Sequence, residues 1–563
     1  MKSLPRGFAV GVGLAILAAA VPARAQHEHH GGAAAETLGT VEFSTSCRPA
    51  ARDGFNRAVA LLHSFEFREA IGGFDTVLAA DPSCAIAHWG RALAFWGNPF
   101  VPGAKGGKPL LDGRAAAEAA RATGKPTPRE RAYIDAVAEL YRDADAATQR
   151  ARVLAYAGAM ERVSRENPDD MEATIFYALA VSQTALPTDK TYAQQLKAVS
   201  LLEPLFAKHP DHPGLAHYII HACDHPPLAA HALEAARRYA KIAPSAPHAL
   251  HMPSHTFTRV GLWQESIDTN TTSADSALKI ASYPEALHAM DYEMYAYLQT
   301  AQDAAARRVL DQVPAVAARL VPDAVTGAAP AVAGYYARAA IPARFALERG
   351  AWREAAALPI VSSPAPYADA ITHFARALGA ARSGNAPAAL PDIQRLTELR
   401  DVLSKAGDAY WSGQVDIQRQ AAEAWVAFAT NRPEDGIAGL RAAANAEDAS
   451  DKAAVTPGPL APARELLAEM LLEAGRANEA LDEFTSTLRR EPMVGVERRE
   501  RDGQRFVTQC DERGRGACRA GSGRQHSGCG VRSPAARAVP ARRHGAARVG
   551  GCTPVATSQE LCS

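Results

Sequence analysis

A 34-residue period runs through most of the chain and restricts its fold more than any other feature. Three stretches, 51–82, 247–280 and 461–492, show it best. Positions 8, 20, 24 and 32 hold Ala58, Ala70, Phe74 and Pro82 in the first stretch, and Ala468, Ala480, Phe484 and Pro492 in the third. The middle stretch has Ser254, Gly261 and Ser266 at positions 8, 15 and 20. Small residues at fixed places, followed by a closing proline, predict a repeated helix–turn–helix unit.

This pattern resembles the tetratricopeptide repeat (TPR) over roughly residues 47–496. The resemblance implies an all-α fold, a right-handed TPR superhelix built as an α-hairpin solenoid, with a concave groove that binds a protein or peptide partner. Gly- and Pro-rich stretches at 98–108, 123–128 and 453–462 predict breaks between helices.

The N-terminus predicts export. Residues 1–25 combine Lys2 and Arg6 with an apolar run and a small-residue cleavage site ending at Ala25, as in a signal peptide. The alternative is an N-terminal anchor, for which an apolar run of about 14 residues is short. We expect a periplasmic or secreted protein without a membrane span in the mature chain, and a mobile His-containing leader at 26–46. The leader's His27, His29 and His30 predict a second, loose metal site.

The charges cancel over the whole chain but are unevenly placed. The sequence has 61 Lys and Arg against 61 Asp and Glu, which argues against a nucleic-acid binder. Residues 497–563, however, contain thirteen Arg, six acidic residues and five of the eight Cys, without apolar periodicity. We interpret this segment as an irregular basic tail, with a frameshift favoured over a natural disordered tail or a Cys-rich appendix. Of the remaining cysteines, Cys47 and Cys84 lie 37 residues apart and are candidates for a disulfide, with free thiols as the alternative.

Histidines are concentrated in one part of the repeat region. Ten of the eighteen lie within residues 209–288, and they recur in phase with the prolines Pro210, Pro244 and Pro284. Counting four, seven and eleven residues on from these prolines gives three rows: Gly214, His248 and His288; His217, His251 and Asp291; His221, His255 and Tyr295. In the repeats that the chain resembles, these rows face the concave groove. The resemblance also places Asp224, His225 and Arg259 there.

The recurrence predicts a transition-metal site. His217 and His221, like His251 and His255, are spaced i,i+4 on one helix face, which suits chelation. We predict that these four imidazoles, with Asp291 as a carboxylate ligand, bind Zn, Cu, Ni or Fe. The predicted groove residues around them are His225, Asp224, His248, Arg259, His288 and Tyr295.

Two other interpretations of the histidines stay open. The first is a polar groove that binds a peptide or a carboxylate ligand without metal, and the second is a purely structural network. His209, His212 and His231 are expected at the surface. His63 and His88 are single occurrences, and His373 has no expected partner. The sequence contains no phosphate-binding loop, dinucleotide fingerprint or nucleophile elbow. We therefore expect an exported binding protein, with a metal-dependent enzyme as the alternative and an assembly scaffold as the second alternative.

Overall fold

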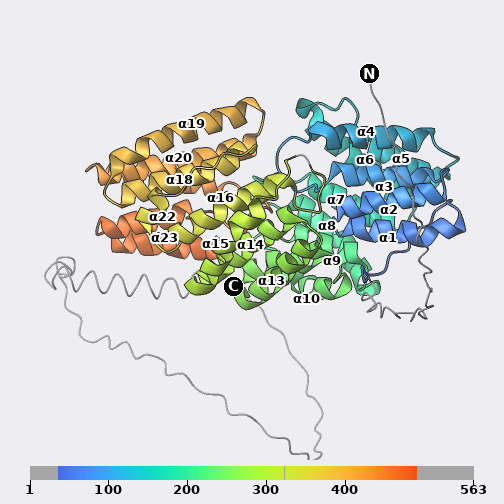
Figure 1. Ribbon diagram of the computed structural model, residues 1–563, viewed down its shortest axis with the longest axis horizontal. Coiled ribbons are helices and arrows are strands. Elements are labelled where there is room, and N and C mark those ends of the chain that lie inside the picture. Colours follow the sequence, from blue (N-terminus) through green and yellow to red (C-terminus); the bar gives the residue numbers. More distant parts are fainter. Residues whose placement is uncertain (1–35, 323, 491–563) are drawn as a thin grey trace, which may run out of the picture. The chain divides into compact units, whose positions relative to one another are not determined.

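The computed structural model describes residues 36–490 apart from residue 323. The predicted signal peptide, residues 26–35 of the leader and the basic tail at 497–563 lie outside the described residues. Within the described residues every regular element is helical, and no helix is long and apolar enough to cross a membrane. Helices follow one another along the chain as packed neighbours, from α1 at the blue end to α23 at the orange end (Figure 1).

The first eight α-helices are α1 (Arg52–His63), α2 (Phe67–Ala80), α3 (Ala85–Trp96), α4 (Gly107–Ala122), α5 (Pro128–Glu139), α6 (Gln149–Glu166), α7 (Met171–Gln183) and α8 (Ala193–Lys208). The next eight are α9 (Pro213–Ala222), α10 (Leu233–Ile242), α11 (Pro247–His251), α12 (Pro253–Val260), α13 (Trp263–Lys279), α14 (Tyr283–Gln299), α15 (Asp303–Ala317) and α16 (Ala331–Leu347). The last seven are α17 (Trp352–Ala356), α18 (Pro366–Arg382), α19 (Leu390–Lys405), α20 (Ala409–Ala429), α21 (Pro433–Asp448), α22 (Ala463–Glu473) and α23 (Ala477–Arg490). Short 3-10 helices are η1 (Pro49–Ala51), η2 (Ala146–Thr148), η3 (Ala229–Ala232) and η4 (Ala386–Ala389).

Helices pair in the way that the 34-residue period predicts. Each helix packs on the next, as α1 does on α2 and α22 on α23, and several also pack on the helix two positions on, as α14 does on α16. Ala58 of α1 and Ala70 of α2 are completely buried. A Cβ on Gly73 would lie only 2.9 Å from the Cβ of Ala58, so small residues are needed where these two helices meet. The predicted all-α fold of stacked helical hairpins is thereby confirmed.

The chain before the first helix is part of the folded body. Leu38, Val41 and Phe43 are buried, and the Thr40 amide donates a hydrogen bond to the Asp211 carbonyl at 2.9 Å. Phe43 contacts the rings of Phe55, Trp89 and Tyr133 at centroid distances of 5.3 Å. These contacts correct the predicted domain boundary, because residues 36–46 of the predicted leader pack against the repeats.

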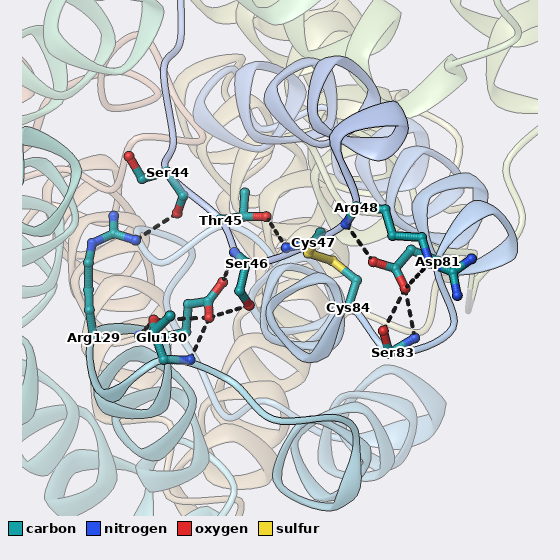
Figure 2. The surroundings of a disulfide bond; sticks show 11 residues. Ser44, Thr45, Ser46, Cys47, Arg48, Asp81, Ser83, Cys84, Arg129 and Glu130 are labelled. Atoms are coloured by element: carbon teal, nitrogen blue, oxygen red, sulfur yellow. Dashed lines mark hydrogen bonds and ion pairs between the residues drawn. A yellow bond between two sulfur atoms is a disulfide. The ribbon is translucent and has the colours of Figure 1, made fainter.

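A disulfide joins this N-terminal segment to the start of the second helical pair (Figure 2). Cys47 and Cys84 have Cα atoms 4.9 Å apart, within the range that a disulfide needs. On one side of the bridge, the Ser46 amide and hydroxyl both donate to the Glu130 carboxylate at 2.7 Å. On the other, the Arg48 amide donates to Asp81 at 2.8 Å. The segment is therefore fixed to α1, α3 and α5 by both covalent and polar contacts.

The predicted breaks are present, and two of them reach the interior. No helix covers residues 97–106, 123–127 or 449–462. Phe100 of the first break stacks on the His221 ring at a centroid distance of 4.2 Å. The third break, which we call the 449–462 loop, pairs Lys452 with Asp224 at 3.1 Å and accepts hydrogen bonds from Tyr292 at its Ala454 and Thr456 carbonyls. Two of the non-helical segments thus contact the histidines or the residues beside them.

Candidate metal centre

Prolines at helix starts place the histidine-bearing helices. Pro213, Pro247, Pro253 and Pro284 occupy the first or second position of α9, α11, α12 and α14, where a missing N–H costs no helical hydrogen bond. Pro253 also separates α11 from α12, so His251 and His255 lie on either side of a helix break. Apart from Ala328, one hydrophobic cluster is built from residues up to Phe257, and the next begins at Ala274. The histidines form a polar layer at this boundary.

Six buried imidazoles gather there in two sets of three. The first set is His217, His221 and His248, and the second set is His251, His255 and His288. Within each set, one ligand atom from every residue lies within 4.8 Å of the others. None of the six residues is more than 6% exposed. The structure therefore brings together all four predicted histidine ligands, divides them between two sets, and adds His248 and His288 as full members.

In the first set, all three Nε2 atoms are buried and lack a hydrogen-bond partner. The Nδ1 atom of His217 lies 2.6 Å from the backbone carbonyl of His63, which can only accept, so Nδ1 carries the proton and Nε2 has a free lone pair. The Nδ1 atom of His248 lies 2.8 Å from Glu285 Oε1. A carbonyl or carboxylate on Nδ1, with Nε2 left free, is the arrangement found for metal-ligating histidines.

Gly214 explains why the first row of the predicted stripe begins without a side chain. A Cβ at Gly214 would lie 2.5 Å from Nδ1 of His63, closer than any real contact. The equivalent positions in the next two repeats are His248 and His288. A histidine at residue 214 would displace His63, whose carbonyl orients His217. The missing side chain is thus required by packing beneath the first set.

Two buried carboxyl groups lie behind His248. Glu66 accepts from the His248 amide at 3.1 Å, and Glu285 contacts its ring nitrogen. A Cβ on Gly327 would lie 3.1 Å from Glu66 and 3.6 Å from Glu285, so the two carboxyl groups flank this glycine. Burial and the neighbouring Glu285 raise the pKa of Glu66 well above its usual value, and burial raises the pKa of Glu285. Among the described residues, no Lys or Arg forms an ion pair with either carboxyl group, so a cation in the first set would balance them.

Burial keeps the six imidazoles neutral. It lowers the pKa of His217, His221 and His248 well below the usual value, with further lowering from neighbouring histidines. The same cause lowers the pKa values of His251 and His288 strongly and that of His255 less, because Asp224 partly offsets burial there. Neutral imidazole is the form that binds a metal ion.

A third cluster near the first set pairs its two histidines through a shared carboxylate, and only Nδ1 of His212 is left buried without a partner. His63 and His212 approach the two oxygens of Glu172 at 2.8 and 2.9 Å, and Nδ1 of His63 lies 2.9 Å from the Tyr218 hydroxyl. Burial alone would raise the pKa of Glu172, but the two histidines bring it below its usual range. His63 and His212 are both buried, which corrects the expectation of a surface position for His212.

Asp291 lies outside both histidine sets. Its carboxylate accepts hydrogen bonds from the Arg344 guanidinium at 3.2 and 3.4 Å, and both side chains are completely buried. Tyr295 lies beside this pair, with the guanidinium carbon 5.0 Å from its ring centre. Asp291 occupies the position in α14 that is equivalent to His217 and His251, but an arginine from α16 binds its carboxylate. This corrects the predicted ligand set.

The remaining predicted groove residues form a charged network beside the second set. Asp224 accepts from Arg259 at 3.0 Å and from Lys452 at 3.1 Å, and it contacts Nδ1 of His255 at 2.9 Å. His225 pairs instead with Asp451 at 2.9 Å. Asp224 and Arg259 thus bind each other, and the carboxylate orients a histidine of the second set.

A cleft of about 310 Å³ has one residue of the first set in its lining. Its lining combines apolar residues of the 98–108 break with polar groups of α8, α9 and the 449–462 loop, namely Phe100, Gln195, His221, Asp224, His225 and Lys452. His221 is the member of the first set that reaches this cleft. A small molecule in the cleft would therefore approach the first set from its His221 side.

Sequence reasoning missed the residues that orient the histidines. Asn270 Oδ1 lies 2.7 Å from Nδ1 of His251, and Glu285 holds His248. One signal was present for Asn270, because Ser266, Asn270 and Ser273 place polar side chains on the same face of α13 and all are completely buried. Nothing in the sequence singled out Glu285, because acidic residues are common in the first turn of a helix, where the helix dipole stabilises them.

Comparison with known proteins adds only distant structural likeness. No family model matches the chain, and no curated protein matches it. Among solved structures, the TPR domain of P58(IPK) is 11% identical with a TM-score of 0.22, over 76% of this chain and 98% of that one. The structure of Naa15/Naa10 bound to HypK-THB is 13% identical with a TM-score of 0.18, over 77% of this chain and 68% of that one.

Proposed function

We propose that this protein is an exported transition-metal-binding protein of helical-repeat architecture, with an ion bound by His217, His221 and His248. One observation carries the proposal: the three residues offer ring nitrogens within 4.8 Å of one another, and each has a buried Nε2 atom without a hydrogen-bond partner. Leaving a buried polar atom unpaired costs roughly 1–3 kcal/mol, so three together need an explanation. An ion bound to all three nitrogens supplies it.

The donor set favours a narrow group of metals. Three imidazole nitrogens suit Zn, Cu, Ni or Fe, whereas Ca and Mg prefer oxygen ligands. The charge of a divalent ion is matched by Glu66 and Glu285 behind His248. Export and a protein or peptide partner, both predicted from the sequence, remain predictions that belong to this proposal.

A metal-dependent enzyme is the second candidate, and the cleft at His221 favours it. Three protein ligands leave a fourth position on a tetrahedral ion, and catalytic zinc sites use that position for water or substrate. The cleft provides a route to it. When bound, the ion would supply Lewis-acid activation of a ligand in that position. The residues of the chain would orient the ion and admit the ligand from the Phe100 side.

The decisive experiment is metal analysis of the full chain purified without an affinity tag. His27, His29 and His30 are replaced by Ala in all samples, so that the leader cannot contribute. We expect bound transition metal in this parent protein and a loss of about one equivalent in the His217→Gln/His248→Gln variant. Unchanged metal content in the variant would disprove a site at the first set.

His373→Gln is the matched control. His373 is also buried and also pairs through Nδ1 with a carboxylate, Asp392, at 2.6 Å. It lies in α18 and belongs to neither set. The control variant should keep its metal. Circular dichroism of all variants separates loss of ligands from loss of fold, and visible absorption of the Co²⁺ form distinguishes imidazole ligands from thiolates of the Cys-containing tail.

A further inference from the structure

The second histidine set has a feature that the first does not: two of its ring nitrogens face each other directly. Nε2 of His251 lies 3.1 Å from Nε2 of His255, and both side chains are at most 1% exposed. Such a distance fits an N–H···N hydrogen bond only if exactly one of the two atoms carries a proton. The contacts on the far sides of the two rings decide where the protons are.

His255 carries its proton on Nδ1. That atom lies 2.9 Å from Asp224, whose carboxylate is ion-paired with Arg259 and Lys452 and can therefore only accept. The Tyr292 hydroxyl lies 3.3 Å from the same nitrogen, but it donates to the Ala454 and Thr456 carbonyls. Neutral His255 thus has a bare lone pair on Nε2.

His251 also carries its proton on Nδ1. Its partner is Oδ1 of Asn270 at 2.7 Å. The orientation of that amide is fixed because its nitrogen donates to the Ser266 carbonyl at 2.6 Å. Oδ1 is therefore an acceptor, and neutral His251 likewise has a bare lone pair on Nε2.

Two lone pairs at 3.1 Å repel each other unless a positive charge lies between them. Two nitrogens that bind one ion at about 2.0–2.1 Å in a tetrahedral site are separated by about 3.3 Å, close to the observed distance. His288 completes the set, with one ring nitrogen within 4.8 Å of the other two ligand atoms and a buried Nδ1 without a partner. The surrounding hydrogen bonds thus leave two facing lone pairs on His251 and His255, and His288 adds a third imidazole beside them.

We propose that His251, His255 and His288 bind a second transition-metal ion, so that the six histidines form a dinuclear centre. The inference extends the proposed function and rests on it for the first ion. The two sets are direct neighbours, since the ring centres of His248 and His251, and those of His221 and His255, are each 5.9 Å apart. Asp224 orients the second set in the way that Glu285 orients the first.

The test is the metal stoichiometry of three full-chain proteins, each carrying the leader substitutions described above. They are the parent, the His217→Gln/His248→Gln variant and the His251→Gln/His288→Gln variant, titrated with Co²⁺ and followed by visible absorption and elemental analysis. We expect about two equivalents in the parent and about one in each variant. In the Cu²⁺-loaded parent, magnetic coupling between neighbouring ions should weaken the paramagnetic resonance signal, and each variant should recover the signal of an isolated ion.

Each result separates the two proposals. If the second variant binds as much metal as the parent, the second site is disproved, while a loss in the first variant still supports the proposed function. If only the second variant loses metal, the first site is disproved instead. Absence of metal from the parent after reconstitution disproves both.

If the His251→Gln/His288→Gln variant does not fold, a milder substitution still tests the second site. Asp224→Asn leaves all six histidines in place but removes the charge that fixes the proton on Nδ1 of His255. We expect a loss of affinity of about 10- to 100-fold for one equivalent only. Equal affinity of both equivalents in Asp224→Asn and parent would contradict a role for His255 as a ligand.

Discussion

Two neighbouring groups of buried histidines differ in how many of their ring nitrogens have a partner within the protein. In the cluster of His63, Glu172 and His212, a carboxylate accepts from both rings and a tyrosine hydroxyl approaches the remaining nitrogen of His63. In the first set, each ring has an Nε2 atom without any partner. In both groups the atoms that could ligate a metal lie within 4.8 Å of one another, so proximity does not distinguish the groups. What distinguishes them is the number of unpaired nitrogens: every ring of the first set has an unpartnered Nε2, whereas in the cluster around Glu172 only Nδ1 of His212 lacks a partner.

The largest effect on stability should come from removing Glu172 from the cluster that it forms with His63 and His212. Glu172→Ala would leave two buried histidines without their shared acceptor, and removing one member of a buried charged network costs about 3–5 kcal/mol. We expect a loss of that size in the free energy of unfolding, measured by urea denaturation, with metal content per folded protein unchanged. Loss of metal without loss of stability would reverse the roles assigned to the two groups.

Metal addition should stabilise the protein through the first set. At a free ion concentration 100 times the dissociation constant, binding to the folded state alone adds about 2.7 kcal/mol. The thermal transition should therefore shift upward on addition of Zn²⁺ to metal-free protein, and His373→Gln should shift equally. In the His217→Gln/His248→Gln variant the shift should be smaller, and an undiminished shift would contradict the site.

Glu285→Gln should weaken the first set without removing a ligand. The carboxylate holds Nδ1 of His248, and loss of such an orienting partner typically costs about 10- to 100-fold in affinity, or about 1.4–2.7 kcal/mol. Competition with a chromophoric chelator would measure the change. Glu293→Gln is the control, since that carboxyl group lies on the same helix and contacts Thr271 instead. Equal loss in both variants would indicate a nonspecific charge effect.

Acid should affect the two groups in different pH windows. The folded-state pKa of His217 is lowered, so the unfolded chain binds the extra proton below about pH 6.5, and stability falls as pH decreases from there. Each such histidine contributes up to about 1.4 kcal/mol per pH unit. The lowered pKa of Glu172 instead gives stability that is present above about pH 4.5 and is lost as pH falls further.

The variant His217→Gln isolates this contribution. Measured on metal-free protein between pH 7 and 5.5, its unfolding free energy should depend less on pH than that of the parent. The Glu172→Ala variant should depend at least as steeply on pH as the parent in this range, because Glu172 raises the pKa of His63 and its loss leaves burial to lower that pKa further. Identical slopes for His217→Gln and the parent would mean that His217 is not held neutral by burial.

Much of this arrangement was predictable from the repeat register, because residues at equivalent positions in stacked hairpins face the same side. That register brought His217, His221, His251 and His255 to one layer and placed His248 and His288 beside them. It failed for Asp291 because an arginine from another hairpin, Arg344, competes for the carboxylate, and the register of one helix carries no information about its partner. The burial of His63 and His212 was missed for the same reason, since Glu172 comes from α7.

The 449–462 loop changes how the repeats depend on one another. In most solenoids a repeat contacts only its neighbours, so unfolding can begin at one end and stop midway. Here the Asp451 amide donates to the Pro187 carbonyl at 2.9 Å, Lys452 binds Asp224, and the Gly458 carbonyl accepts from Arg344 at 3.3 Å. The first two contacts connect segments more than 200 residues apart, and the third connects segments 114 residues apart. We therefore expect these segments to unfold together. During synthesis the N-terminal repeats emerge first, so the surroundings of Asp224 are completed only when nearly the whole repeat region has left the ribosome.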